Sequence, residues 1–154
     1  MRIGLISDTH GLVRPDVAAA LRGVELILHA GDVGSLDVLD ELECMAAVDA
    51  ERGNGDPLDI MVPLTVAREL GGLTVLVTHG HELGSPTPER LAQRYRADII
   101  VFGHTHRPLV RHVGPTLVVN PGAAGPRRFH LMPSVGLLTI EAGAARVDIV
   151  NLSA

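Results

Sequence analysis

The sequence predicts an α/β protein in which two mixed β-sheets pack face to face, with helices outside. Strand-like and helix-like segments alternate in the first half of the chain, glycine-containing hairpin connections occur in the second half, and strand-like segments outnumber helical ones. The length of 154 residues suits one domain, 1–154. Hydrophobic residues make up 46% of the chain but aromatic ones only 2%, so Val, Leu, Ile and Ala must build the core.

The first half of the chain predicts a βαβ unit that a further helix and strand extend. Apolar runs predict strands at 2–7, 25–29 and 45–50. Helices are expected between them, at 15–21, which opens with a proline, and at 35–42, which follows a potential serine cap. Parallel strands therefore come first in this chain.

The second half predicts strands joined by tight connections. Gly71-Gly72 separates the runs 66–70 and 73–78, a spacing typical of a hairpin. A helix is expected at 88–95. Further strands are expected at 98–102, 109–113, 117–120, 135–141 and 145–151. The segment 122–133, rich in proline and glycine, is predicted to be a long loop.

Composition excludes several classes of function. The formal net charge of −5 disfavours a basic groove for stable nucleic-acid binding. Because the chain has no lysine, P-loop phosphate binding and Schiff-base chemistry are excluded. Cys44 is the one cysteine, so neither an internal disulfide nor a cysteine metal cluster can form, and we expect it to be a small core residue. No apolar run approaches the length of a membrane span, and we expect a cytoplasmic protein.

Polar residues that can bind metal ions gather where predicted strands end. They follow five different strands and are Asp8, His10, Asp32, Asn54, His79, His104 and His106. In open α/β sheets, ligands bind beyond the carboxyl ends of the strands, so we expect these side chains to meet in one crevice. Taken alone, each short segment that contains one of these residues is typical of a capped turn. Two neighbouring residues are given structural roles: His29 as a strand-end residue and Asp56 as a stabiliser of its turn.

The mixture of donors suits borderline divalent ions. Carboxylate, amide and imidazole ligands together favour Mn, Fe, Co, Ni or Zn, whereas an all-oxygen site would favour Mg or Ca. Seven ligands exceed what one open catalytic ion needs. Two ions about 3.5–4 Å apart that share one bridging Asp would leave positions for water and substrate. Their residual positive charge would attract a phosphate despite the negative net charge of the chain.

Five motifs resemble those of the calcineurin-like metallophosphoesterases, in the same order. They are Ser7-Asp8-Thr9-His10, Gly31-Asp32, Gly53-Asn54-x-Asp56, Thr78-His79-Gly80-His81 and Gly103-His104-Thr105-His106. The small size and Asn120-Pro121-Gly122 resemble the YfcE-type phosphodiesterases, whose fold is a four-layer αββα sandwich. The resemblance implies a phosphodiesterase that cleaves its substrate with a two-metal-activated hydroxide.

The resemblance also implies a role for individual residues. One ion would be held by Asp8, His10, Asp32 and His106, and the other by Asp32, Asn54, His79 and His104. Asp32 would be the bridge, and Asp32, Asn54 and His81 are the candidate catalytic residues. Mn²⁺ is the expected ion, with Ni, Co, Fe or Zn as alternatives. His81 could either contact the substrate or support a ligand.

Two positions near the expected site are candidate substrate contacts. Gly55 stands where relatives place a His or Cys, so the usual acid for the leaving group is missing. Arg127, in Pro126-Arg127, is a candidate phosphate clamp. The expected substrate is a small phosphodiester or nucleotide, and a homo-oligomer is compatible with this interpretation. Two alternatives stay open: a phosphomonoesterase or dinucleoside tetraphosphatase of the same superfamily, and a non-catalytic protein-binding scaffold with the same fold.

Overall fold

The computed structural model describes residues 1–128 and 130–153, so that Phe129 and Ala154 lie outside the described residues. The strands within this part are β1 (Arg2–Ile6), β2 (Leu26–His29), β3 (Ala47–Ala50), β4 (Thr65–Leu70), β5 (Leu73–Thr78), β6 (Ile99–Val101), β7 (Leu109–Val113), β8 (Thr116–Asn120), β9 (Ser134–Glu141) and β10 (Ala144–Asn151). The helices are α1 (Val17–Ala20), α2 (Leu36–Glu43) and α3 (Pro88–Arg94), and the segment η1 (His81–Leu83) is a single 3₁₀ turn. Each strand and helix predicted from the sequence is therefore present.

The strands form two mixed sheets of five strands each within the described residues. The first sheet has the order β10-β9-β1-β2-β3, and the second has the order β4-β5-β6-β8-β7. Strands β1, β2 and β3 are parallel in the first sheet, as are β5, β6 and β8 in the second. The hairpin predicted at Gly71-Gly72 joins β4 to β5 as an antiparallel pair.

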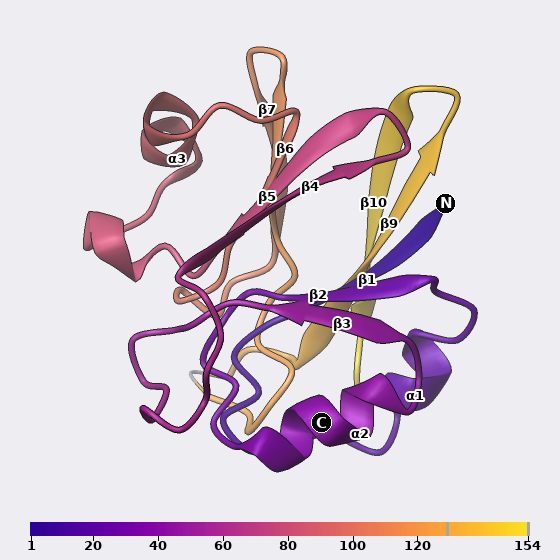
Figure 1. Ribbon diagram of the computed structural model, residues 1–154, viewed down its shortest axis with the longest axis vertical. Coiled ribbons are helices and arrows are strands. Elements are labelled where there is room, and N and C mark those ends of the chain that lie inside the picture. Colours follow the sequence, from indigo (N-terminus) through magenta and orange to yellow (C-terminus); the bar gives the residue numbers. More distant parts are fainter. Residues whose placement is uncertain (129, 154) are drawn as a thin grey trace.

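Apolar residues on both faces of the central strands explain the layered architecture. In β1, Ile3 and Leu5 point into the core between the sheets, where they pack with Val75 and Val77 of β5. The outward-facing residues of the first sheet pack against α1 and α2, and those of the second pack against α3. Figure 1 shows α1 and α2 below the strands and α3 at the upper left. The predicted four-layer αββα sandwich is confirmed.

Two details differ from the sequence-based expectations. The first helix comprises only Val17–Ala20, and within it only Val17 is buried. Cys44 is exposed rather than part of the core, because it caps the end of α2 while Val38 and Leu42 face the interior. The loop predicted at 122–133 is confirmed for its described residues, 122–128 and 130–133, which lie between β8 and β9, whereas Phe129 lies outside the described residues. None of the described helices combines the length and the apolar character required to cross a bilayer.

The carboxyl ends of the parallel strands meet at one edge of the sandwich. In the first sheet, the backbone N–H of Asp8 donates to the carbonyl of Gly31 at 3.0 Å. In the second sheet, the N–H of Gly103 donates to the carbonyl of His79 at 3.1 Å. The His79 ring connects the two sheets, because its Nδ1 lies 2.8 Å from the carbonyl oxygen of Ala30. The loops that carry the candidate ligands are therefore joined to one another.

Candidate metal centre

Two buried carboxylates each use one oxygen for anchoring and direct the other inward. Asp8 Oδ2 accepts hydrogen bonds from the Ser7 hydroxyl at 2.6 Å and from the backbone N–H of His104 at 3.2 Å. Asp32 Oδ1 accepts a hydrogen bond from the backbone N–H of Gly55 at 2.8 Å. Both carboxylates are therefore held in orientation by the chain itself, and one oxygen of each faces the same space.

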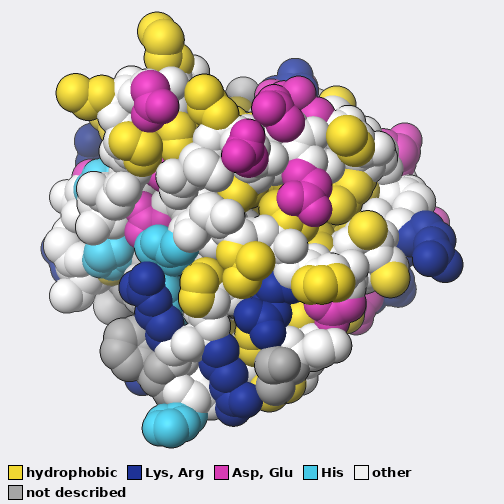
Figure 2. Space-filling view, turned by 90° about the horizontal axis from the view of Figure 1, so that it is seen from below, with side chains coloured by type: hydrophobic (Ala, Val, Ile, Leu, Met, Phe, Trp, Pro, Cys, Tyr) yellow, Lys and Arg dark blue, Asp and Glu magenta, His cyan; other side chains and the backbone are white. Residues whose placement is uncertain are grey.

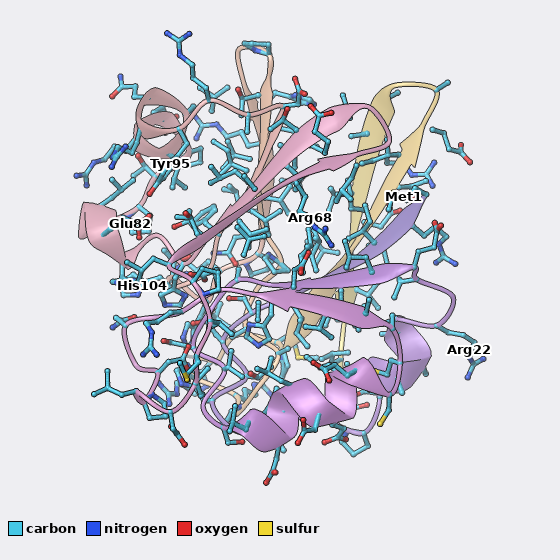
Figure 3. All side chains as sticks on the ribbon, viewed as in Figure 1. Met1, Arg22, Arg68, Glu82, Tyr95 and His104 are labelled. Carbon is cyan, nitrogen blue, oxygen red and sulfur yellow. The ribbon has the colours of Figure 1, made fainter. Side chains whose placement is uncertain are left out.

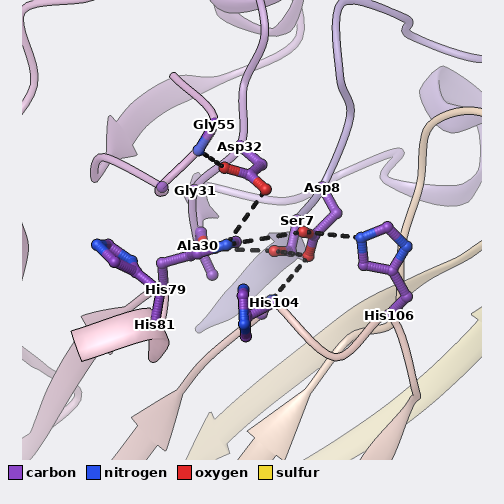
Figure 4. Close-up of polar contacts among 12 residues, drawn as sticks. Ser7, Asp8, Ala30, Gly31, Asp32, Gly55, His79, His81, His104 and His106 are labelled. Atoms are coloured by element: carbon purple, nitrogen blue, oxygen red, sulfur yellow. Dashed lines mark hydrogen bonds and ion pairs between the residues drawn. The ribbon is translucent and has the colours of Figure 1, made fainter. Parts of the chain in front are cut away.

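Three imidazole rings surround these inward-facing oxygens, and Figure 4 shows two of them, those of His79 and His106. His106 Nε2 lies 3.2 Å from Asp8 Oδ1, and His79 Nε2 lies 3.3 Å from Asp32 Oδ2. His10 Nε2 lies 3.8 Å from Asp8 Oδ1 and 3.7 Å from Asp32 Oδ2. His79 Nε2 is also 3.9 Å from Asp8 Oδ1. Residues from both sheets thus converge on one centre.

Several atoms at this centre lack the hydrogen bonds that buried polar groups normally make. Asp8 Oδ1, His10 Nε2 and His79 Nε2 are buried and have no hydrogen-bond partner among the described residues. Two groups of potential metal ligands overlap here, Asp8 with His10 and His106, and Asp8 with Asp32 and His79. Within each group the ligand atoms lie within 4.8 Å of one another. Carboxylate oxygens and imidazole nitrogens arranged in this way fit divalent cations.

The ligand-bearing loops have an unusual backbone conformation. A positive φ is found at Asp8 (53°), His10 (46°), Asp32 (54°), His104 (69°) and His106 (63°). This left-handed region is unfavourable for residues with a side chain, although Asp and His occur there more often than most. The backbone N–H of Thr105 donates a hydrogen bond to the Gly103 carbonyl and so bends the loop between its two histidines. The His106 ring faces Asp8, and the His104 ring contacts His79. Such conformations cluster at functional sites.

Two glycines are required here because the chain passes directly against the carboxylates. A Cβ at Gly53 would lie 2.2 Å from Asp32 Oδ1, and one at Gly103 would lie 2.1 Å from Ser7 Oγ. Gly55 is different, because its φ is not positive and a Cβ there would lie 3.2 Å from Asp32 Oδ1. A side chain at position 55 therefore requires only a small local adjustment.

Asn54 lies at the edge of the centre and is exposed. Its neighbours Gly53 and Gly55 both approach Asp32, so the turn that carries Asn54 is held against this carboxylate. Asp56 fixes the same turn, because its Oδ2 accepts a hydrogen bond from the N–H of Gly53 at 2.9 Å. The structural role expected for Asp56 is confirmed.

Two further histidines, His104 and His81, lie beside His79. The His104 ring meets the His79 ring edge-on, with 5.2 Å between the ring centroids. The His81 ring is tilted against the His79 ring, with 5.4 Å between the ring centroids. The structure therefore brings His81, at the start of η1, close to the candidate ligands.

Arg127 is exposed and lies at the opposite side of the centre, where it lines a small hollow with His106 and Arg128. Arg128 is also close enough to His10 to help lower the pKa of that ring. Figure 2 shows histidine side chains gathered on one part of this face, with arginine side chains directly beside them. Both arginines therefore remain candidates for contact with an anionic substrate.

Burial and neighbouring charges shift the pKa values of four candidate ligands at the centre. Burial opposes ionisation of Asp32, but the nearby His79 ring and the hydrogen bond from the Gly55 N–H outweigh this effect and lower the pKa of Asp32. Burial opposes a charge on His79, yet Asp32 and Asp8 together raise the pKa of this ring. Burial lowers the pKa values of His10 and His104, which favours the unprotonated rings that ligation requires.

His29 is a buried structural residue, as expected. Its Nδ1 accepts a hydrogen bond from the N–H of Gly31, and its Nε2 lies 2.9 Å from the Thr9 hydroxyl oxygen. Burial lowers the pKa of His29 to about 4, so the ring is neutral at physiological pH. This neutral ring holds the turn after β2 in place.

Three residues near the centre were not assigned a role from the sequence. Ser7 orients Asp8, and Asn120 donates hydrogen bonds to the Gly103 carbonyl and to the Thr105 hydroxyl, both at 3.0 Å. Both residues belong to the motifs named above, which was the available signal. Glu51 is buried, and burial raises its pKa to about 10. No pattern around Glu51 in the sequence predicted that this residue is buried near the centre.

Comparisons with known proteins support the same classification as the motifs. A family model described as the calcineurin-like phosphoesterase superfamily domain matches residues 1–143. A probable metallophosphoesterase of Methanothermobacter thermautotrophicus is 36% identical and covers 100% of this chain and 94% of its own. A phosphodiesterase of Methanocaldococcus jannaschii is 30% identical and covers 92% of this chain and 94% of its own. A solved structure of a Vps29 mutant from Entamoeba histolytica has a TM-score of 0.83 at 23% identity, covers 99% of this chain and 100% of its own, and is similar in fold.

Replacing Ser7 tests whether the orientation of Asp8 matters for metal binding. Ser7→Ala removes the hydroxyl that holds Asp8 Oδ2, and we expect the affinity for Mn²⁺ to fall about 10- to 100-fold in titration calorimetry. Ser134→Ala is the matched control, because Ser134 is equally buried and its hydroxyl donates to the Pro121 carbonyl at 2.7 Å. An unchanged affinity in Ser7→Ala would contradict the role assigned to Ser7.

Proposed function

Because the chain belongs to the calcineurin-like phosphoesterase superfamily, we propose that it is a divalent-metal-dependent phosphodiesterase with a two-ion centre. The observation that carries this proposal is the convergence of Asp8 Oδ1, His10 Nε2 and His79 Nε2, all buried and without hydrogen-bond partners among the described residues. A relative from Methanocaldococcus jannaschii bears the name phosphodiesterase, which supports a phosphodiester as the substrate.

The seven candidate ligands divide between two ions in this proposal. One ion is assigned to Asp8, His10, Asp32 and His106, and the other to Asp32, Asn54, His79 and His104. The position of Asp32 Oδ2 supports its role as the bridge, since it lies 3.7 Å from His10 Nε2 and 3.3 Å from His79 Nε2. Asp8 Oδ1 also lies close to histidines of both groups, so variants of both carboxylates are needed to identify the bridge.

When bound, two divalent ions would lower the pKa of a coordinated water and neutralise charge on the phosphoryl oxygens. The chain supplies the rest of the site. The carbonyl of Ala30 can only accept a hydrogen bond, so it holds the proton of His79 on Nδ1 and directs the Nε2 lone pair to the centre. His81 is assigned to the substrate side next to His79, and Arg127 to the phosphate side next to His106.

Removal of the metal tests the proposed function. We expect hydrolysis of bis(p-nitrophenyl) phosphate to be lost after chelation and restored best by Mn²⁺, because the donors are nitrogen and oxygen without a thiolate. Release of p-nitrophenolate gives the rate, with Mg²⁺ as the control ion. Full activity in excess chelator would contradict the proposal, and a scaffold would bind its partner equally well with or without metal.

The number of bound ions tests the bridging residue. Asp32→Ala is expected to lose both ions, whereas Asn54→Ala should weaken mainly one, because only Asp32 belongs to both assigned sets. Metal content measured by mass spectrometry after gel filtration gives the stoichiometry, with Asp8→Ala compared in the same way. Retention of two ions by Asp32→Ala would show that the bridge is misassigned, and loss of both ions in Asp8→Ala would then assign it to Asp8.

Position 55 tests the consequence of the missing acid. General acid catalysis contributes about 10²- to 10⁴-fold, so its loss should matter most for poor leaving groups. We expect bis(p-nitrophenyl) phosphate to be cleaved faster than p-nitrophenyl phosphate, because its aryl leaving group needs little help from an acid and the extra charge of the monoester makes attack by hydroxide harder. We expect Gly55→His to increase kcat more for alkyl than for aryl leaving groups. Gly55→Ala is the control for the added Cβ. An equal change for both types of leaving group would show that another group protonates the leaving oxygen.

A further inference from the structure

A second pocket lies beside the candidate metal centre and has no role in the function proposed so far. It has a volume of about 350 Å³. Its lining residues are Leu64, Thr65, His81, Glu82, Arg94 and Tyr95, and we refer to it as the side pocket. Its size falls in the range of small-molecule sites.

The side pocket and the candidate metal centre share a boundary. His81 lines the pocket, and its ring centroid lies 5.4 Å from that of His79. Figure 3 shows Tyr95, Glu82 and His104 following one another along the same side of the molecule. A molecule whose phosphate occupies the metal centre could therefore extend past His81 into the side pocket.

Hydrogen bonds hold the polar wall of the side pocket in a defined position. Glu82 Oε1 accepts hydrogen bonds from the Tyr95 hydroxyl and from the Thr78 hydroxyl, both at 2.6 Å. Thr78 is the last residue of β5 and directly precedes His79. The Tyr95 ring is thus connected to the strand that carries a candidate ligand, which favours a pocket that exists before the substrate binds.

The lining of the side pocket also includes an apolar residue that is exposed to solvent. Leu64 has an exposed fraction of 62% although it is a large aliphatic residue. It ends the loop 51–64, which also carries Asn54. The Arg94 guanidinium lies 5.1 Å from the centroid of the Tyr95 ring, so the pocket combines an aliphatic side chain, an aromatic ring and a cation. Planar aromatic groups are favourable partners for all three.

We propose that the side pocket binds an aromatic ring of the substrate, so that the preferred substrates are phosphodiesters with an aryl or nucleobase-bearing ester group. The inference rests on the proposed function, because the phosphate of such a substrate has to occupy the metal centre. Small alkyl esters would leave the pocket empty and gain nothing from Leu64 or Tyr95. The pocket therefore determines which diesters bind well, whereas the metal centre determines that a phosphodiester binds at all.

The chain contains its own reporter for this pocket. Tyr95 is the one tyrosine in the sequence and there is no tryptophan, so tyrosine fluorescence arises at the pocket wall. Phenylphosphonate and methylphosphonate are non-hydrolysable probes that differ in the ring. In the Mn²⁺-loaded protein we expect phenylphosphonate to bind about tenfold more tightly by calorimetry and to change the Tyr95 fluorescence.

Equal affinities without a fluorescence change would overturn the inference but leave the proposed function intact, because both phosphonates would still bind in a metal-dependent way. If neither probe binds and no diester is cleaved, the proposed function fails and the inference fails with it. Loss of self-association in Leu64→Asp, measured by sedimentation, would assign the pocket wall to contact with a second copy of the chain and also overturn the inference.

Two substitutions in one loop distinguish an effect on the side pocket from a general effect on the loop. Leu64→Asp places a charge in the side pocket and is expected to abolish the preference for phenylphosphonate. Leu58→Asp is the matched control, because Leu58 lies in the same loop, has an exposed fraction of 90% and does not line the pocket. Circular dichroism confirms folding of both variants. Retention of the preference in Leu64→Asp would show that the ring binds elsewhere.

Discussion

The burial of two acidic side chains at the edge shared by both sheets is the constraint on which the rest of this structure depends. Asp8 and Asp32 lie almost entirely out of contact with water, where a carboxylate is stable only with hydrogen bonds and a compensating charge. Ser7 and the backbone N–H groups of His104 and Gly55 supply the hydrogen bonds. In the proposed metal centre, the bound ions would supply the compensating charge.

The strained backbone around these carboxylates follows from the same constraint. Side chains from four different loops face one small volume, and a regular turn does not direct them there. Left-handed residues in these loops are unfavourable by about 1–3 kcal/mol each. The two sheets offset this cost, because the central strands bury apolar residues on both faces. The stability of the sandwich therefore allows the loops to keep their unfavourable conformations.

The sequence predicted the layers and the candidate ligands because both depend on local patterns. Alternating residues such as Ile3 and Leu5 predict a strand buried between layers, and the motifs with His79 and His104 occur directly after such strands. The core position expected for Cys44 was wrong. Its neighbours in the sequence are apolar, but helix α2 ends at this residue and its side chain is exposed. Glu51 could not be anticipated either, because its burial arises from contacts between loops that are distant in the sequence.

The contact between His79 and the Ala30 carbonyl has a consequence beyond the orientation of one ring. Candidate ligands come from both sheets, so ions bound as proposed would fasten one half of the sandwich to the other. A ligand that binds only the folded chain increases its stability in proportion to the logarithm of the ligand concentration. Scarcity of the metal would then increase the fraction of chains open to proteases as well as reduce turnover. The cellular amount of this protein would follow the supply of its ion.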